Sequence, residues 1–89
     1  MSRDTVRIYL TDSCSYCGAA RMLLTRKGVS YEERVVNRDP ELRAEMERRS
    51  GRTSVPQIFI GETHVGGFDD LCMLDKSGEL DKLLATVES

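Results

Sequence analysis

Two cysteines separated by two residues, in the segment Cys14-Ser15-Tyr16-Cys17, are the side chains best suited to chemistry. The segment follows a strand-like apolar run and precedes a helix-like one, so it falls at the start of a helix. At that spacing the thiols share one face, one turn apart, close enough to form a disulfide. The helix start offers unpaired N–H groups and a positive dipole, which favour the thiolate of Cys14. The spacing predicts a redox pair, with an exposed Cys14 as nucleophile and a more shielded Cys17 as resolving thiol.

The alternative interpretation of the pair is structural, either as small buried side chains or as half of a zinc site. A structural zinc site needs two further ligands, and only Cys72 and His64 remain, which are not spaced as a ligand pair. Cys72 itself is expected to pack in the core. We therefore favour the redox interpretation. A helix terminus alone is expected to lower the pKa of Cys14 by about one unit, and Asp12 opposes that shift.

Hydrophobic periodicity predicts the elements that must position these thiols. Asp39-Pro40 is typical of a helix N-cap followed by its first residue, and Gly51 of a helix end. The predicted elements are a strand at 6–10, a helix at 15–27, a strand at 31–36, a helix from Asp39-Pro40 to Gly51, strands at 57–60 and 63–65, and a last helix capped by Asp69, interrupted at Gly78 and continued for one or two turns to 87. This order puts the cysteines at the carboxyl edge of the sheet, where open α/β folds bind ligands.

Two further segments suggest a binding site. Val55-Pro56 at the head of a strand is either a simple strand start or a cis proline that turns the Val55 backbone toward an extended peptide. The segment 66–70, Gly-Gly-Phe-Asp-Asp, is a backbone break followed by a helix start. N–H groups at such a start accept a carboxylate, and a nearby Asp pairs with an ammonium group. A ligand with both groups would be the α-amino acid end of a γ-glutamyl peptide.

Length and composition narrow the class of protein. The 89 residues predict one domain, 1–89, and 39% hydrophobic with 31% charged residues is typical of a compact soluble globule. A net charge of −2 argues against a nucleic-acid partner. Three cysteines are too few for a disulfide scaffold. The charged N-terminus has no apolar signal region, and no run is long enough to span a bilayer, so a cytoplasmic location without membrane contact is expected.

The chain resembles the glutaredoxin family in three segments that occur in the family's order: Cys14-Ser15-Tyr16-Cys17, 53–60 (Thr-Ser-Val-Pro-Gln-Ile-Phe-Ile) and 66–71 (Gly-Gly-Phe-Asp-Asp-Leu). The resemblance covers nearly the whole chain. It implies an α/β thioredoxin fold with a four-stranded mixed sheet flanked by helices, in the order βαβαββα. It also implies a glutathione-dependent thiol–disulfide oxidoreductase that reduces protein disulfides and glutathione mixed disulfides.

The same resemblance assigns roles to individual residues. Cys14 would take up glutathione, whose cysteinyl backbone would pair with the cis-proline site, and the Phe68 N–H and Asp69 would hold the γ-glutamyl end. Arg43 falls where the family often has a contact to the glycine carboxylate. The complete set that the resemblance assigns to glutathione is Tyr16, Arg43, Ser54, Val55, Pro56, Gly67, Phe68 and Asp69.

The chain departs from the family pattern at Ser15, where Pro is usual, at Thr11, where Lys is common, and at Gly18-Ala19, where a His-Arg pair often stands. Some family members with Cys-Ser-Tyr-Cys hold a 2Fe–2S cluster between two monomers. A monomer without metal is expected, and a cluster-bridged dimer with Cys14 and glutathione as ligands is one alternative. A redoxin reduced by thioredoxin reductase, for which Phe68 is a hint, is another.

Overall fold

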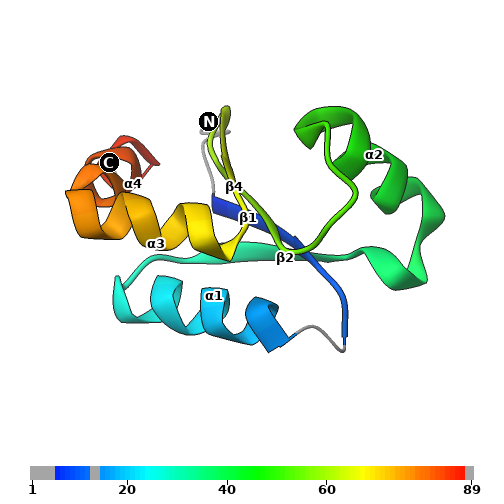
Figure 1. Ribbon diagram of the computed structural model, residues 1–89, viewed down its shortest axis with the longest axis horizontal. Coiled ribbons are helices and arrows are strands. Elements are labelled where there is room, and N and C mark those ends of the chain that lie inside the picture. Colours follow the sequence, from blue (N-terminus) through cyan, green and yellow to red (C-terminus); the bar gives the residue numbers. More distant parts are fainter. Residues whose placement is uncertain (1–5, 13–14, 88–89) are drawn as a thin grey trace.

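Strands and helices alternate around one four-stranded sheet (Figure 1). The computed structural model describes residues 6–12 and 15–87. Its elements are β1 (Val6–Leu10), α1 (Ser15–Arg26), β2 (Tyr31–Val35), the 3₁₀ helix η1 (Val36–Arg38), α2 (Pro40–Ser50), β3 (Gln57–Ile60), β4 (Thr63–Gly66), α3 (Phe68–Ser77) and α4 (Glu79–Val87). Among the helices of these residues, none has the length and apolarity that a membrane crossing requires.

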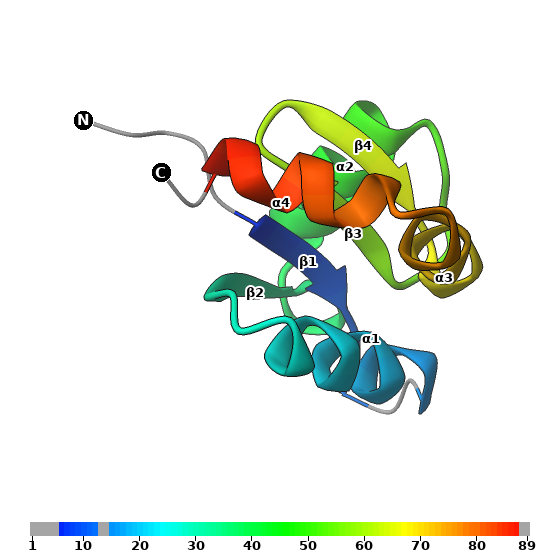
Figure 2. The ribbon, with the colours of Figure 1, turned by 90° about the vertical axis from the view of Figure 1, so that its left-hand side faces the viewer.

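The sheet is mixed, as expected, and its register brings the site segments together. β1 pairs in parallel with β2 and antiparallel with β3, and β3 pairs antiparallel with β4, in the order β2-β1-β3-β4. Tyr9 opposes Gln57, and Ile58 opposes Gly66. The end of β1, the start of β3 and the end of β4 therefore meet at one edge. α1 and α3 follow β1 and β4, so both helices begin at that edge (Figure 2).

The two faces of the sheet carry unequal cores. α1, α3 and α4 cover one face and α2 the other (Figures 1 and 2). The larger core lies under α1, α3 and α4 and contains Val6, Ile8, Leu10, Cys17, Ala20, Leu23, Leu24, Val29, Ile58, Ile60, Leu71, Leu80 and Leu84. The smaller core lies under α2 and contains Tyr9, Val36, Met46 and Phe59. This division follows the alternation of side chains along β1 and β3.

The ends of α2 are as the sequence predicts. The Asp39 carboxylate accepts hydrogen bonds from the N–H groups of Glu41 (2.9 Å) and Leu42 (3.3 Å), and Pro40 stands in the first turn. Gly51 ends the helix in the left-handed conformation, with a φ of 72°. These local signals fixed the boundaries because each satisfies backbone groups that a helix end leaves unpaired.

Five boundaries differ from the prediction. α1 ends one residue early, at Arg26, β4 runs one residue further, to Gly66, and the other three differences change which residues fill the core or cap a helix. Val36 leaves the strand and begins η1, where its side chain fills the smaller core. The last helix does not begin after a cap at Asp69: Gly67 occupies the N-cap position, and Asp69 lies inside the first turn. The interruption at Gly78, with a φ of 85°, separates two full helices, because α4 runs for nine residues after it.

Candidate active site

The start of α1 presents one buried and two exposed side chains. Ser15 and Tyr16 are exposed, whereas Cys17 is fully buried in the larger core. This burial agrees with the shielded thiol that the sequence predicts at that position. Cys14, the predicted nucleophile, lies outside the described residues.

The strand end that leads to the cysteines is tied to η1. Arg38 binds the carboxylate of Asp12 through Nη2, at 2.7 Å, and through Nε, at 2.8 Å. The Asp12 N–H is 3.4 Å from the side-chain oxygen of Asn37. An opposite charge therefore accompanies the carboxylate that precedes Cys14 by two residues.

An open groove of about 280 Å³ lies at the edge where α1 and α3 begin. It is lined by Tyr16, Arg52, Ser54, Val55, Pro56, Gly67, Phe68, Asp69 and Asp70. Residues 54–56, from the loop before β3, form what we call the first wall. Residues 67–69, at the start of α3, form the second wall. The volume is near the lower end of the range for small-ligand sites, as suits an extended ligand lying on the surface.

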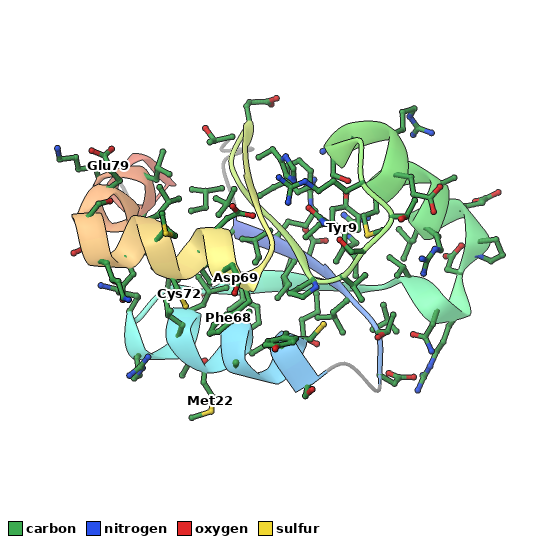
Figure 3. The ribbon with its side chains drawn as sticks, in the orientation of Figure 1. Tyr9, Met22, Phe68, Asp69, Cys72 and Glu79 are labelled. Atoms are coloured by element: carbon green, nitrogen blue, oxygen red, sulfur yellow. The ribbon has the colours of Figure 1, made fainter. Side chains whose placement is uncertain are left out.

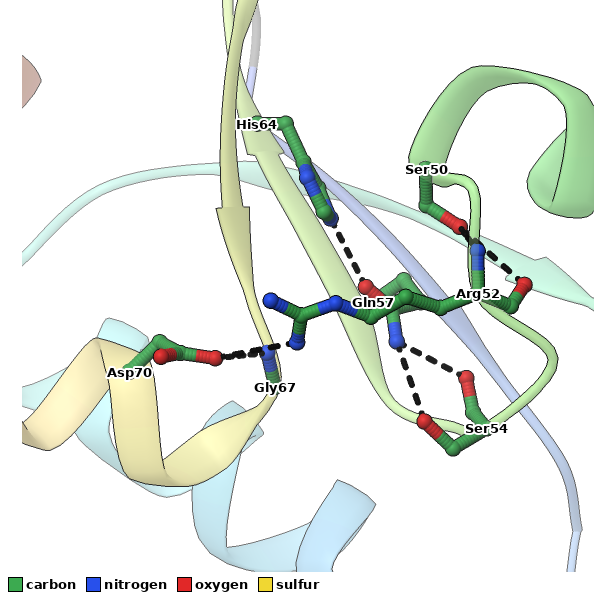
Figure 4. Close-up of polar contacts among 7 residues, drawn as sticks. All are labelled: Ser50, Arg52, Ser54, Gln57, His64, Gly67 and Asp70. Carbon is green, nitrogen blue, oxygen red and sulfur yellow. Dashed lines mark hydrogen bonds and ion pairs between the residues drawn. The ribbon is translucent and has the colours of Figure 1, made fainter.

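The first wall is a loop that turns at a cis Val55–Pro56 peptide bond and is held from behind by a buried amide. The Gln57 side chain is fully buried and donates from Nε2 to the Ser54 carbonyl oxygen (3.0 Å) and to the Ser54 Oγ (3.3 Å) (Figure 4). His64 of β4 contacts the other end of that amide, with 2.8 Å between Nε2 and Gln57 Oε1.

The second wall is a helix start that is held by a carboxylate. Asp70 Oδ2 accepts the Gly67 N–H at 3.0 Å and lies 3.2 Å from Nη1 of Arg52 (Figure 4). The Gly67 hydrogen bond is the main cause that holds the pKa of Asp70 below its ordinary value; burial opposes this effect, and the Arg52 contact adds to it. Arg52 thereby connects the loop before β3 to α3.

Two aromatic rings join the start of α1 to the second wall. The rings of Tyr16 and Phe68 are tilted at 31° with centroids 6.1 Å apart. Tyr16 remains 62% exposed, so its ring is available to a ligand. Figure 3 shows Phe68 and Cys72 between α3 and α1, and Cys72 packs partly buried against the larger core, as expected.

The described residues contain no preformed metal-binding site. Within residues 6–12 and 15–87, no group of three or more His, Cys, Asp and Glu side chains is placed so that it could hold a metal ion. The groove instead offers aromatic surface, a helix N-terminus and one cation, which together fit an organic ligand with a carboxylate.

Known proteins match this sequence closely. A model of the glutaredoxin family matches residues 6–65. The chain belongs to the glutaredoxin family. A glutaredoxin of Pseudomonas aeruginosa is 56% identical over 90% of this chain and 95% of its own length. Glutaredoxin 3 of Escherichia coli K12 is 52% identical over 89% of this chain and 95% of its own. As a glutaredoxin, the protein is a thiol–disulfide oxidoreductase with a thioredoxin fold.

Solved glutaredoxin structures share the fold. The solution structure of glutaredoxin from Brucella melitensis has a TM-score of 0.80 and 52% identity, over 94% of this chain and 91% of that one. A structure described as "Metal Binding of Glutaredoxins" has 53% identity and a TM-score of 0.70, over 91% of this chain and 88% of that one. A buckwheat glutaredoxin–glutathione complex has a TM-score of 0.86 over 94% of this chain and 79% of that one, and its 23% identity speaks to the fold alone.

The groove of this glutaredoxin brings together most of the residues assigned from sequence. Every residue assigned to glutathione lines it except Arg43. Arg43 projects from α2, donates from Nη2 to the Thr53 carbonyl oxygen at 2.9 Å and pairs with Glu47 at 3.3 Å. It therefore supports the loop that leads to the first wall without lining the groove.

Sequence reasoning missed four residues that shape the groove. Arg52 and Asp70 line it, and Gln57 and His64 stand behind the first wall. A signal existed for Asp70, because a carboxylate three residues after an N-cap commonly accepts the N-cap N–H. Finding the Gln57–His64 contact required the strand register, since the two residues lie on different strands.

Proposed function

We propose that this glutaredoxin is a glutathione-dependent thiol–disulfide oxidoreductase that reduces protein disulfides and glutathione mixed disulfides. Cys14 is the proposed nucleophile and Cys17 the resolving thiol. The supporting observation is the groove, which joins Tyr16, two residues after Cys14, to both walls. A groove next to the reactive thiol lets the bound tripeptide present its sulfur for attack.

The reaction is two thiol–disulfide exchanges. The Cys14 thiolate attacks the glutathionyl sulfur of a glutathionylated protein, the bond between that sulfur and the protein breaks, and the protein thiolate leaves and takes a proton from solvent. A second glutathione thiolate attacks the glutathionyl sulfur on Cys14, which releases glutathione disulfide and restores the thiolate. When the substrate is a protein disulfide, the Cys14 thiolate attacks one of its sulfurs, the protein S–S bond breaks and the first protein thiolate leaves. Cys17 then attacks the Cys14 sulfur of this mixed disulfide and displaces the second protein thiolate, and two glutathiones reduce the resulting Cys14–Cys17 bond and leave as glutathione disulfide.

The walls suggest how the tripeptide lies. The first wall, with Ser54, Val55 and Pro56, would run alongside the cysteinyl backbone of glutathione. At the second wall, the Gly67 N–H is taken by Asp70, and the Phe68 N–H belongs to a helix start that attracts the γ-glutamyl carboxylate.

Side chains around the walls would complete the contacts. The exposed Asp69 would pair with the γ-glutamyl ammonium, and Tyr16 would cover the groove. Arg43, anchored on the Thr53 carbonyl, is proposed for the glycine carboxylate at the outer end.

Turnover of the mixed disulfide between glutathione and mercaptoethanol tests this function. With glutathione and glutathione reductase, Cys17→Ser should retain activity, Cys14→Ser should lose it, and Cys72→Ser should match the wild type. Activity that survives in Cys14→Ser would contradict the assignment. Replacing this donor system by thioredoxin reductase tests the other redoxin hypothesis, and faster turnover with thioredoxin reductase would favour it.

A cluster-binding dimer is a second candidate, supported by the 53% identity to a glutaredoxin studied for metal binding. Because the described residues of one chain hold no group of three ligating side chains, a 2Fe–2S cluster would need Cys14, glutathione thiolates and a second chain. Anaerobic reconstitution with iron, sulfide and glutathione distinguishes the candidates. A brown dimer supports the cluster, and a colourless monomer rules it out.

We further propose that residues 1–89 form one domain and act as a monomer in the cytoplasm, where the glutathione pool is reducing. Reducible mixed disulfides and protein disulfides would be its partners, without nucleic acid or membrane. Cooperative thermal unfolding in one transition and elution as a monomer are expected. Two separate transitions would contradict the single domain.

A further inference from the structure

The first wall is connected to β4 through a chain of buried and half-buried polar groups. Gln57 is the buried polar side chain of the described residues, with an exposed fraction of 0%. It lies directly after Pro56 and contacts Ser54 on one side and His64 on the other (Figure 4). A buried amide without partners would be strongly destabilising, so these contacts fix where the side chain lies.

The contacts of Gln57 also fix which end of the amide is which. The Ser54 carbonyl oxygen only accepts hydrogen bonds, so the group 3.0 Å from it must be the Gln57 NH₂. The same NH₂ lies 3.3 Å from Ser54 Oγ. Both contacts belong to the residue that forms the edge of the groove. The Gln57 amide therefore binds both the main-chain carbonyl and the side-chain hydroxyl of Ser54.

His64 must be the donor in its contact with this amide. Gln57 Oε1 is an acceptor, so the His64 Nε2 that lies 2.8 Å away carries the hydrogen. Burial, followed by the nearby Arg52 charge, lowers the pKa of His64, and Asp70 offsets this effect only in part. The lowered pKa favours the neutral ring at pH 7, and the contact with Gln57 Oε1 places its hydrogen on Nε2.

The strand register explains why His64 reaches Gln57. Phe59 pairs with His64, and Gln57 lies two residues before Phe59 on the same face of β3. The rings of Phe59 and His64 are in contact, with centroids 4.8 Å apart and planes tilted by 33°. This ring contact and one hydrogen bond determine the orientation of the imidazole.

We propose that His64 is a positioning residue for glutathione, which acts through Gln57 to hold Ser54 and the first wall in the geometry that the tripeptide needs. His64 does not itself line the groove. The proposal rests on the proposed use of glutathione, because only a ligand that lies along the first wall depends on its position. A purely structural role for His64 would affect stability and leave ligand preference unchanged.

The rates of reaction with two different disulfides distinguish a positioning role of His64 from a purely structural one. Glutathione disulfide requires the groove, whereas dithiodipyridine reports the reactivity of the thiolate without using the walls. His64→Phe keeps an aromatic ring on Phe59 and removes the donor. His64→Gln restores an N–H donor at a similar reach. Thr63→Val, on the exposed neighbour in β4, is the control for changes in the strand itself.

We expect His64→Phe to react with glutathione disulfide about 3- to 10-fold more slowly, the factor that one ordinary hydrogen bond supplies. Its rate with dithiodipyridine should remain that of the wild type. His64→Gln should recover most of the loss, and Thr63→Val should show none. The amide resonances of Ser54 and Val55 should shift in His64→Phe and return toward wild-type positions in His64→Gln.

Several results would overturn the proposal. Equal rates for His64→Phe and wild type with glutathione disulfide would exclude a positioning role, as would equal losses with both disulfides. Failure of His64→Gln to recover would exclude the hydrogen bond as the cause. A wild type with no preference for glutathione disulfide, and no resonance shifts on adding glutathione, would instead refute the proposed function.

Discussion

The two walls line the same groove, but contacts of opposite character hold them in place. Behind the first wall lies Gln57, a neutral and fully buried amide that contacts Ser54 and a neutral imidazole. The second wall depends on Asp70, a half-exposed carboxylate that accepts the Gly67 N–H and pairs with Arg52. A buried neutral contact is little affected by salt, whereas an exposed charged one is screened. The walls should therefore respond differently to pH and ionic strength.

The second wall also depends on a backbone position that only glycine suits. Gly66 has a φ of 116°, which side chains strongly disfavour. A Cβ at this position would lie 2.3 Å from Asp70 Oδ2 and 2.8 Å from Asp70 Cγ. The glycine therefore allows the carboxylate to approach the Gly67 N–H. Charge and backbone shape act together at this wall.

The largest effect is expected from Gly66→Ala. Backbone strain, together with displacement of the Asp70 carboxylate, should lower the free energy of unfolding by roughly 2–4 kcal/mol. Urea denaturation measures the loss. Gly18→Ala is the matched control, because a Cβ there meets nothing within 4 Å and the site is helical, so a gain of about 0.5–1 kcal/mol is expected. Equal stability of Gly66→Ala and wild type would contradict this account of the second wall.

Gln57→Met tests the first wall without changing its charge. Met fills a similar volume but leaves the Ser54 carbonyl and the His64 donor without their buried partner, so a loss of roughly 1–3 kcal/mol is expected. The loss should be the same at low and high salt. Urea denaturation at two ionic strengths checks both statements, and a loss that disappears in high salt would show that the contact is not the neutral one described.

Asp70→Ala should remove about 1 kcal/mol of stability at pH 7, the usual contribution of a helix N-terminal cap. The pKa of Asp70 is lowered in the folded protein, so its contribution is fully present above the unfolded pKa of about 3.9 and disappears as pH falls through the folded value. Wild type and Asp70→Ala should therefore converge in stability below about pH 4. A difference that stays constant down to low pH would contradict the role of the ionised carboxylate.

The smallest effect is expected from Arg52→Gln. Both partners of its ion pair are about half exposed, at 49% and 45%, so the variant should lose only about 0.2–1 kcal/mol. That loss should fade in high salt. Lys82→Gln, which removes a longer pair with Glu79 on α4, gives the baseline for an ordinary surface contact. If Arg52→Gln and Lys82→Gln have equal effects on glutathione disulfide reduction, Arg52 has no part in the groove.

Local signals in the sequence predicted the helices, the strands and most of the residues that line the groove. They did not predict the side-chain contacts between strands. Pro56 and the glycines at 66 and 67 could be recognised from the sequence because each residue type suits particular backbone positions, and Cys17 could be recognised by its spacing from Cys14. The Gln57–His64 contact depends on an irregular register between β3 and β4, which no local pattern encodes.

The charged residues show a second limit of sequence reasoning. Asp69 and Asp70 are neighbours of the same type. The residue at which the helix begins decides which of the two carboxylates accepts the hydrogen bond from the N-cap N–H, and with Gly67 as N-cap it is Asp70. Arg43 and Arg52 are likewise equivalent by type, but only Arg52 lines the groove. The role of Cys14 remains a prediction, because it lies outside the described residues.

Mass spectrometry of Cys17→Ser after exposure to glutathione disulfide tests the central claim most directly. This variant retains two thiols, Cys14 and Cys72, and cannot resolve a mixed disulfide internally. We predict one glutathionyl group per chain, located on Cys14 by peptide mapping and released by added glutathione. Modification of Cys72 in its place, or an unmodified Cys14, would contradict the mechanism proposed for this glutaredoxin.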